Sequence, residues 1–204
     1  MTTPTKLNAK KRKEVTVKTV IELSSKQNPS DITTSAIANE MGLTQGALFR
    51  HFPTKESIFE AVIAWISKKL LNSAKKKSME AKDPLDAIKN IFNLHVDIVV
   101  KHPGVPRLLF GELQQEKDSL TKKAAKVLMS EYSKLLIKIF KQGKERGFFK
   151  SNLDEELAAF LFIGLIQGLV VSSLLNGSVK EIEKRALPAL EIFLEGISCE
   201  KIIP

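Results

Sequence analysis

The sequence predicts an all-α protein in which a small three-helix N-terminal domain precedes a larger helical domain. Apolar residues recur mainly at spacings of three and four along the 204 residues, which is typical of amphipathic helices. Residues 33–55 are typical of two short helices joined by a tight turn, a helix-turn-helix. Longer helical patterns follow residue 83, and a hydrophobic content of 43% is enough to bury a core.

The N-terminal part is expected to hold four helices. Asn28 and Pro29 end the first of them, because asparagine tolerates a left-handed cap and proline cannot continue a helix. Gly42 permits the tight turn between the second and third helices, and Thr54 is a candidate N-cap for the fourth. In chain order, these helices are expected over residues 7–27, 34–41, 44–51 and 54–71.

The C-terminal part is expected to hold five more helices. Asp83 and Pro84 suit the start of a helix, and Ser178 with Glu181 forms a capping box. Pro188 is expected to kink or interrupt the last helix, because it cannot donate a backbone hydrogen bond. In chain order, these helices are expected over residues 83–102, 105–114, 118–146, 154–175 and 178–198.

The net charge of +9 is concentrated in the N-terminal part of the chain. Residues 1–82 carry +8 and residues 83–204 carry +1. A basic surface attracts polyanions, which favours nucleic acid as a partner, although solvated lysine-rich helices would give the same balance. Cys199 is the single cysteine, and residues 1–12 lack the apolar stretch of a secretion signal, so we expect a reducing, cytoplasmic location.

Residues near the helix starts of the 33–55 segment suit contacts with DNA. Thr33 and Thr34 begin the second helix, where hydroxyl and backbone N–H groups can hold a phosphate. Thr44, Gln45 and Gly46 open the third helix. Gln45 can pair with an adenine edge, and Gly46 permits close approach to DNA.

Basic residues follow at the far end of this segment. Arg50 and His51 suit contacts with the DNA backbone. Lys55 stands at a helix start, where a cation is unfavourable, and this placement suggests an external anion. The alternative is that the threonines only cap helices and that Lys55 is a solvated surface charge.

Residues 34–56 resemble the N-terminal signature of the TetR/AcrR family of bacterial transcription regulators, and the resemblance extends over about residues 7–60. It implies a homodimeric, ligand-responsive regulator, most often a repressor, whose partners are a palindromic double-stranded DNA operator and a small-molecule effector. Accordingly, we expect a DNA-binding domain at 1–53, a connecting helix and linker at 54–82, and an effector-binding and dimerisation domain at 83–204.

The resemblance also implies a set of DNA-facing residues. Phe49 stands where the family usually has tyrosine, so it offers an apolar contact in place of a phosphate contact, and Asn28 stands where the family usually has glycine. The residues that match the family's DNA-facing positions are Thr33, Thr34, Thr44, Gln45, Gly46, Phe49, Arg50, His51 and Lys55.

The second domain is expected to dimerise and to bind an apolar or amphipathic ligand. The 154–175 helix is apolar almost all round, so it needs partners on several sides. The expected interface residues are Phe160, Leu161, Gly164, Gly168, Val171, Leu190, Phe193, Leu194 and Ile197. The candidate ligand-lining residues are Trp65, Phe92, His95, Phe110, Glu112, Tyr132 and Phe162, each of which ordinary core packing would also explain.

Two other classes of function remain open from the sequence. Residues 157–175 form an uncharged stretch of 19 residues, close to the length that spans a bilayer, and a membrane anchor is the less favoured alternative. The second alternative is a helical carrier or enzyme that does not bind DNA. No metal-ligand spacing, phosphate-binding loop or nucleophile elbow is present, so we expect no catalytic residue, metal or cofactor.

Overall fold

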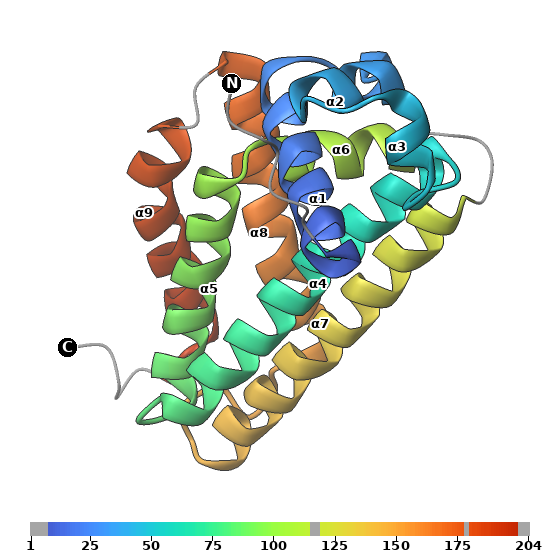
Figure 1. The fold of residues 1–204 in the computed structure, drawn as a ribbon. Coiled ribbons are helices and arrows are strands. Elements are labelled where there is room, and N and C mark those ends of the chain that lie inside the picture. Colours follow the sequence, from blue (N-terminus) through green and yellow to red (C-terminus); the bar gives the residue numbers. More distant parts are fainter. Residues whose placement is uncertain (1–7, 115–118, 178–179, 200–204) are drawn as a thin grey trace. The chain divides into compact units, whose positions relative to one another are not determined.

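The computed structural model describes residues 8–114, 119–177 and 180–199. Its described part contains helices and no strand, which confirms the all-α prediction (Figure 1). The elements are α1 (Ala9–Lys26), a 3-10 turn η1 (Pro29–Asp31), α2 (Thr34–Glu40), α3 (Gln45–Phe49), α4 (Lys55–Glu80), α5 (Pro84–Lys101), α6 (Gly104–Leu113), α7 (Leu120–Glu145), α8 (Glu155–Asn176) and α9 (Lys180–Ile197).

Helix α4 is longer than the sequence suggested. We expected it to end near residue 71, before the lysine run 75–77, but it continues to Glu80. Leu70 and Ala74 are buried and extend its apolar stripe by a further turn, and lysine and alanine are both good helix formers. The expected linker therefore shrinks to residues 81–83, because α5 begins at Pro84.

Two local features near helix ends differ from what we expected. Helix α9 is not interrupted at Pro188; it runs through this residue as one element, with Ala186 and Leu190 buried on either side, and a kink at Pro188 stays a prediction. Asn28 does not adopt a left-handed conformation: it is extended (φ −65°, ψ 131°), and its side chain accepts a hydrogen bond from the Ser30 N–H, which caps η1. The expected cap Ser178 lies outside the described residues.

The protein divides into two compact units that are not contiguous in sequence. The first contains the chain up to Ser67 together with the described part of residues 102–126. The second contains residues 68–101 and the described part of the chain from Val127 onward. This division differs from the three consecutive segments that we expected, because α6 and the start of α7 belong with the N-terminal helices.

Helix α6 joins the first unit by packing on α1. The contact is close at Gly104, where a Cβ atom would lie 2.8 Å from the Ser25 backbone nitrogen and would also collide with the Ile21 carbonyl. Glycine is needed here because any side chain would push the two helices apart. The start of α6 is therefore fixed against the helix that supports the N-terminal domain.

An aromatic cluster forms the core of the second unit. Phe92 lies edge-on to Phe162 with ring centroids 5.6 Å apart, and Phe140 lies 5.5 Å from Phe149. Phe193 on α9 contacts both Phe140 and Phe162, at 6.2 and 6.0 Å. The cluster fixes α5, α7, α8 and α9 around one centre, since edge-to-face pairs at these separations are favourable.

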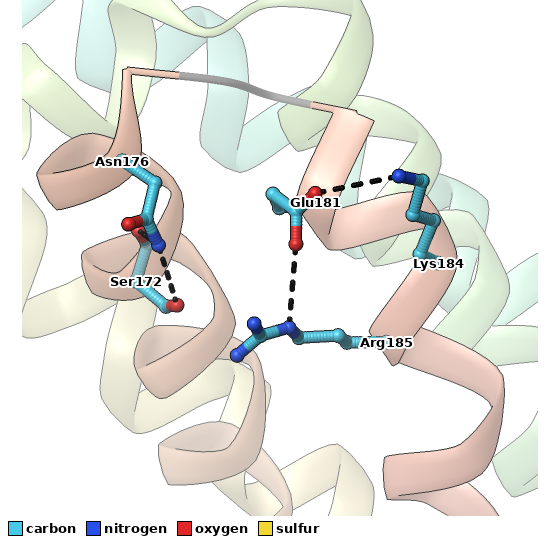
Figure 2. A network of polar contacts seen from close by, with 5 residues as sticks. All are labelled: Ser172, Asn176, Glu181, Lys184 and Arg185. Atoms are coloured by element: carbon cyan, nitrogen blue, oxygen red, sulfur yellow. Dashed lines mark hydrogen bonds and ion pairs between the residues drawn. The ribbon is translucent and has the colours of Figure 1, made fainter.

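Local polar contacts order the adjoining ends of α8 and α9 (Figure 2). The Asn176 side-chain amide donates to the Ser172 carbonyl at 2.9 Å within α8. Glu181 pairs with Lys184 and Arg185, each at 3.5 Å, within the first turns of α9. All these contacts lie within single helices, so they stabilise each helix end separately.

Candidate nucleic-acid interface

Helices α2 and α3 form a compact pair in the first unit. Ile37 and Ala38 of α2 and Leu48 of α3 are almost fully buried. Gly42 makes the turn with φ +63°, in the left-handed region that favours glycine. The Leu43 N–H donates to the Ala38 carbonyl at 2.8 Å and closes the end of α2. The pair therefore has the rigid, tightly turned geometry of a helix-turn-helix.

The threonines at the two helix starts act as N-caps. The Thr33 Oγ1 atom accepts from the Ala36 N–H at 3.0 Å, and the Thr44 Oγ1 atom accepts from the Ala47 N–H at 3.2 Å. A hydroxyl that accepts in a cap keeps its own hydrogen for another acceptor. Both residues are exposed, so capping leaves these hydroxyls able to donate to a phosphate.

The start of α3 is open to the outside. Gln45 is exposed, and its Nε2 atom donates to Thr34 Oγ1 at 2.6 Å, which orients the amide between the two helices. A Cβ atom on Gly46 would meet no neighbouring described atom within 4 Å. No sequence pattern indicated the Gln45–Thr34 bond, which joins two predicted site residues across a separation of 11 positions.

The far end of α3 presents mixed chemistry. Phe49 is 40% exposed and Arg50 is also exposed, whereas His51 is half-buried. Phe52, which is almost fully buried, anchors the chain behind them, and the Lys13 ammonium of α1 lies 5.6 Å from its ring centroid. This cation–π contact places α1 beside the end of α3.

The basic start of α1 is a further candidate DNA-contacting segment, which we did not expect from the sequence. Asn8 caps the helix by accepting from the Lys11 N–H at 2.8 Å, so the lysine run is helical from Ala9 onward. Lys10, Lys11 and Lys13 are exposed. The concentration of positive charge near the N-terminus was the available signal, but only the structure places these lysines on a helix beside α3.

Lys55 is engaged inside the protein. Its Nζ atom donates to the Ser30 carbonyl at 3.0 Å and lies 5.2 Å from the Phe59 ring centroid. Burial lowers the pKa of the Lys55 ammonium, and the carboxylates of Glu112 and Asp31 oppose this effect. The unfavourable position of a lysine at a helix start thus has an explanation within the chain, besides the external anion that we expected.

The candidate ligand-lining residues fall into both units. Phe92, Tyr132 and Phe162 are fully buried in the second unit, where His95 Nδ1 lies 3.2 Å from the Tyr132 hydroxyl. The remaining candidates, Trp65, Phe110 and Glu112, belong to the first unit, and Trp65 lies edge-on to His102 at 5.3 Å.

His95 and Tyr132 are the polar pair within the core of the second unit. Although part of the His95 residue remains accessible to solvent, its ring is enclosed, and burial lowers its pKa to about 4. Burial also raises the pKa of the Tyr132 phenol. Both groups are therefore neutral at physiological pH and joined by a neutral hydrogen bond.

One face of α8 is apolar and is left uncovered by the described part of the protomer. Phe160 is 70% exposed, Leu161 and Val171 are also exposed, and Cβ atoms on Gly164 and Gly168 would meet no described neighbour within 4 Å. These positions recur at spacings of three and four, so they share one side of the helix.

The α9 residues expected at the interface pack against the protein's own core. Leu190, Leu194 and Ile197 are buried inside the protomer, and Phe193 packs in the aromatic cluster. Their apolar spacing marks the face that α9 turns toward its own core. The exposed apolar residues of α9 are instead Leu187 and Ile192.

Helix α8 is also the one described helix that is long and apolar enough to span a membrane, and 44% of its most apolar window is buried in the protein. Buried core helices pass the same test of length and composition. Ala158, Phe162 and Ile166 of α8 are buried, and the helix packs on α9 and α5.

Comparisons with known proteins cover nearly the whole chain. Residues 18–62 match the family model of bacterial regulatory proteins of the tetR family, and residues 66–196 match the C-terminal region of YsiA-like proteins. The nucleoid occlusion factor SlmA of Vibrio cholerae is 27% identical over 78% of this chain and 81% of its own length. The SlmA of Shewanella woodyi is 32% identical over 70% and 73%.

Solved structures share the fold at lower identity. The transcriptional regulator FadR of Bacillus subtilis, solved in complex with stearoyl-CoA, has a TM-score of 0.78 and 18% identity, over 90% of this chain and 98% of FadR. The family matches, the shared fold and the capped α2–α3 pair all indicate an N-terminal helix-turn-helix followed by a helical C-terminal domain.

Proposed function

This chain belongs to the TetR family of bacterial regulatory proteins, and from this premise we propose that it binds a palindromic operator as a homodimer and leaves it when a small amphipathic ligand binds. It is a DNA-binding transcriptional regulator, and the relatives found are regulators rather than enzymes. Beyond DNA binding, we propose that the protein acts as a repressor, that it is a homodimer, and that a small-molecule effector controls it. We also propose that it acts in the cytoplasm, where bacterial DNA lies.

The exposed start of α3 is the observation that carries the proposal. Thr44, Gln45 and Gly46 are exposed at the start of α3, whose other side is anchored by the buried Leu48. A rigid helix with small and amide side chains at its exposed start suits the major groove. Arg50 and the α1 lysines would supply phosphate contacts around it.

The uncovered apolar face of α8 supports the homodimer. Two half-sites about 34 Å apart need two heads related by a two-fold axis, and an isologous helix face provides one. The open positions at Gly164 and Gly168 would let two copies of α8 approach closely. Leu187 and Ile192 of α9 would extend this surface.

Sedimentation velocity tests the dimer. Phe160→Glu puts a charge in the middle of the proposed interface and should convert the dimer to monomer, because an unpaired buried charge is costly. Met79→Glu is the matched control, since Met79 is also exposed but lies on α4. A Phe160→Glu protein that remains dimeric would remove the α8 face from the proposal.

Long-chain acyl-CoA is the effector that we would test first. The FadR structure that shares this fold contains stearoyl-CoA, and the C-terminal match is to YsiA-like proteins. The second unit offers apolar side chains and one neutral polar pair, His95 and Tyr132, which suits an acyl chain better than an ion. Binding there would favour a conformation with lower operator affinity.

Fluorescence anisotropy with duplexes from the DNA that flanks the gene tests the DNA-binding part. We expect steep salt dependence, altered base preference in Gln45→Ala, and no change in Asn39→Ala, an exposed α2 control. Stearoyl-CoA should weaken binding to the operator duplex. If no amphipathic ligand that is tested changes the affinity for the operator, the proposal of ligand-controlled repression is wrong.

Nucleoid occlusion is the second candidate, favoured by the SlmA relatives. Genome-wide mapping of bound DNA separates the two functions. Sites confined to a few promoters would support a repressor, whereas many sites dispersed over the chromosome would support an occlusion factor.

A further inference from the structure

Two polar side chains are joined by a hydrogen bond across the candidate DNA-binding surface. Gln45 is the first residue of α3, and Thr34 is the first residue of α2. The Gln45 Nε2 atom donates to Thr34 Oγ1 at 2.6 Å, which is shorter than most bonds of this kind. Gln45 is exposed and Thr34 is half-buried, so an otherwise mobile glutamine side chain is tied to the supporting helix of the pair.

The backbone of the helix pair sets the separation between these two residues. Thr33 and Thr44, the residues directly before them, cap α2 and α3 and so fix where each helix begins. The turn between the helices is closed by the Leu43 N–H, which donates to the Ala38 carbonyl at 2.8 Å. Because all these contacts lie within the protein, the bond between the two side chains is present before any DNA is bound.

The bond decides which atoms of the Gln45 amide remain available. A primary amide offers one carbonyl oxygen as acceptor and two N–H donors, and Thr34 occupies one of the donors. Since oxygen and nitrogen lie on opposite sides of the amide carbon, the Oε1 atom is turned away from Thr34. The amide thus presents a fixed acceptor and one remaining N–H, whereas an untethered amide turns over about its terminal torsion and presents its donors equally well.

Base edges in the major groove distinguish these two orientations of the amide. Adenine N6 and cytosine N4 are amino groups that donate to an acceptor, whereas guanine O6 and thymine O4 are acceptors themselves. A fixed carbonyl oxygen therefore pairs with adenine or cytosine and is repelled by guanine or thymine. The remaining N–H of the amide suits adenine N7, so adenine is the favoured base.

We propose that Thr34 is a positioning residue for base recognition: it holds the Gln45 nitrogen, so that Oε1 selects adenine or cytosine at one position of each operator half-site. The Thr34 hydroxyl accepts in this bond and keeps its own hydrogen, which suits a neighbouring phosphate. The base contact and the backbone contact are then linked through a single side chain. The inference rests on the proposed function, because it requires α3 to enter the major groove.

Thr34→Val tests this role, because valine keeps the shape of threonine and removes the oxygen that accepts from Gln45. Bound sequences are first selected from a random duplex library, and the position read by Gln45 is the one whose base preference disappears in Gln45→Ala. Fluorescence anisotropy with four duplexes that differ only at this position then measures the discrimination. We expect the wild type to favour adenine or cytosine about tenfold over guanine and thymine, and Thr34→Val to reduce this ratio below about threefold.

Two further variants separate positioning from a general loss of affinity. Thr34→Ser retains the hydroxyl and should retain the base preference. Ser35→Ala removes an exposed hydroxyl from the next residue of α2 and should leave the preference at this position unchanged. A wild-type preference for guanine or thymine, or full discrimination in Thr34→Val, would overturn the proposal.

Hydrogen exchange of side-chain amides, followed by NMR in the free protein, examines the bond without DNA. The Gln45 N–H that is bound to Thr34 should exchange at least about twofold more slowly than the corresponding N–H of Gln142, an exposed glutamine of α7, and Thr34→Val should remove the difference. Equal exchange in the wild type and Thr34→Val would overturn the proposal. A protein that selects no sequence from the library contradicts the proposed function itself, whereas the exchange result still decides whether Thr34 positions Gln45.

Discussion

The enclosed His95 ring makes the stability of this protein depend on pH in a window that can be calculated. Burial lowers the pKa of His95 from 6.5 to about 4. Between these values the unfolded chain binds a proton that the folded chain excludes, so stability falls as the pH falls. The full effect, reached below pH 4, is about 3 kcal/mol, an upper bound because part of the residue touches solvent.

The calculated loss is uneven across the window. From the same two pKa values, His95 costs about 0.2 kcal/mol at pH 7 and about 2 kcal/mol at pH 5. The Tyr132 hydroxyl can act as donor to a neutral ring or as acceptor from a charged one, so the hydrogen bond itself offsets little of this. The penalty comes from placing a cation in the core of the second unit.

Urea unfolding at pH 7 and pH 5 measures the effect when the wild type is compared with His95→Asn. Asparagine places a non-titrating polar atom near the position of Nδ1, so other titrating groups cancel in the comparison. We expect the wild type to lose up to about 2 kcal/mol more than the variant between the two pH values. Equal losses in the two proteins would refute the argument that the ring is excluded from protonation.

Four further substitutions follow from the packing and the interface. Gly104→Ala should destabilise the protein by about 1–3 kcal/mol in urea unfolding, because the added Cβ would collide with α1. Gly111→Ala, on the same helix, is the control and should be neutral or stabilising by up to about 1 kcal/mol. Equal effects of the two substitutions would contradict the close α1–α6 contact. Thr121→Val should stabilise by about 1 kcal/mol, because its buried hydroxyl has no partner among the described residues, and a loss of stability would indicate a hidden partner. Phe49→Tyr should tighten DNA binding about fivefold in anisotropy measurements by adding a phosphate donor, and no gain would mean that the exposed ring faces away from DNA.

The α8 helix illustrates how far a sequence pattern can lead. Its uncharged, apolar stretch predicted a helix with partners on several sides, and the bounds 154–175 lie within one residue of those observed. The pattern could not separate the face covered by the protein's own core from the uncovered face. For α9 this ambiguity was decisive: Leu190, Leu194 and Ile197 have apolar spacing because they are core residues.

The candidate ligand set shows the same limit. Aromatic residues such as Phe92 and Phe162 attract attention in a sequence, but a large apolar side chain contributes as much to core packing as to a binding site. The sequence offered no way to assign Trp65 and Glu112 to a different compact unit from His95. That assignment depends on α6 returning to α1, a contact between residues about 80 positions apart.

The sequence by itself determined the helical class, the helix-turn-helix, and the nine helices of the described residues with most of their bounds. These features were predictable because periodicity, caps and turn glycines act between neighbours a few residues apart. Tertiary structure alone decided what Lys55 touches, which face of α9 is free, and which helices share a unit. Those outcomes depend on side chains distant in sequence that compete for the same space and charge. Lys55 is the clearest case: its odd position was visible in the chain, but Ser30, Asp31 and Glu112 became its neighbours only on folding.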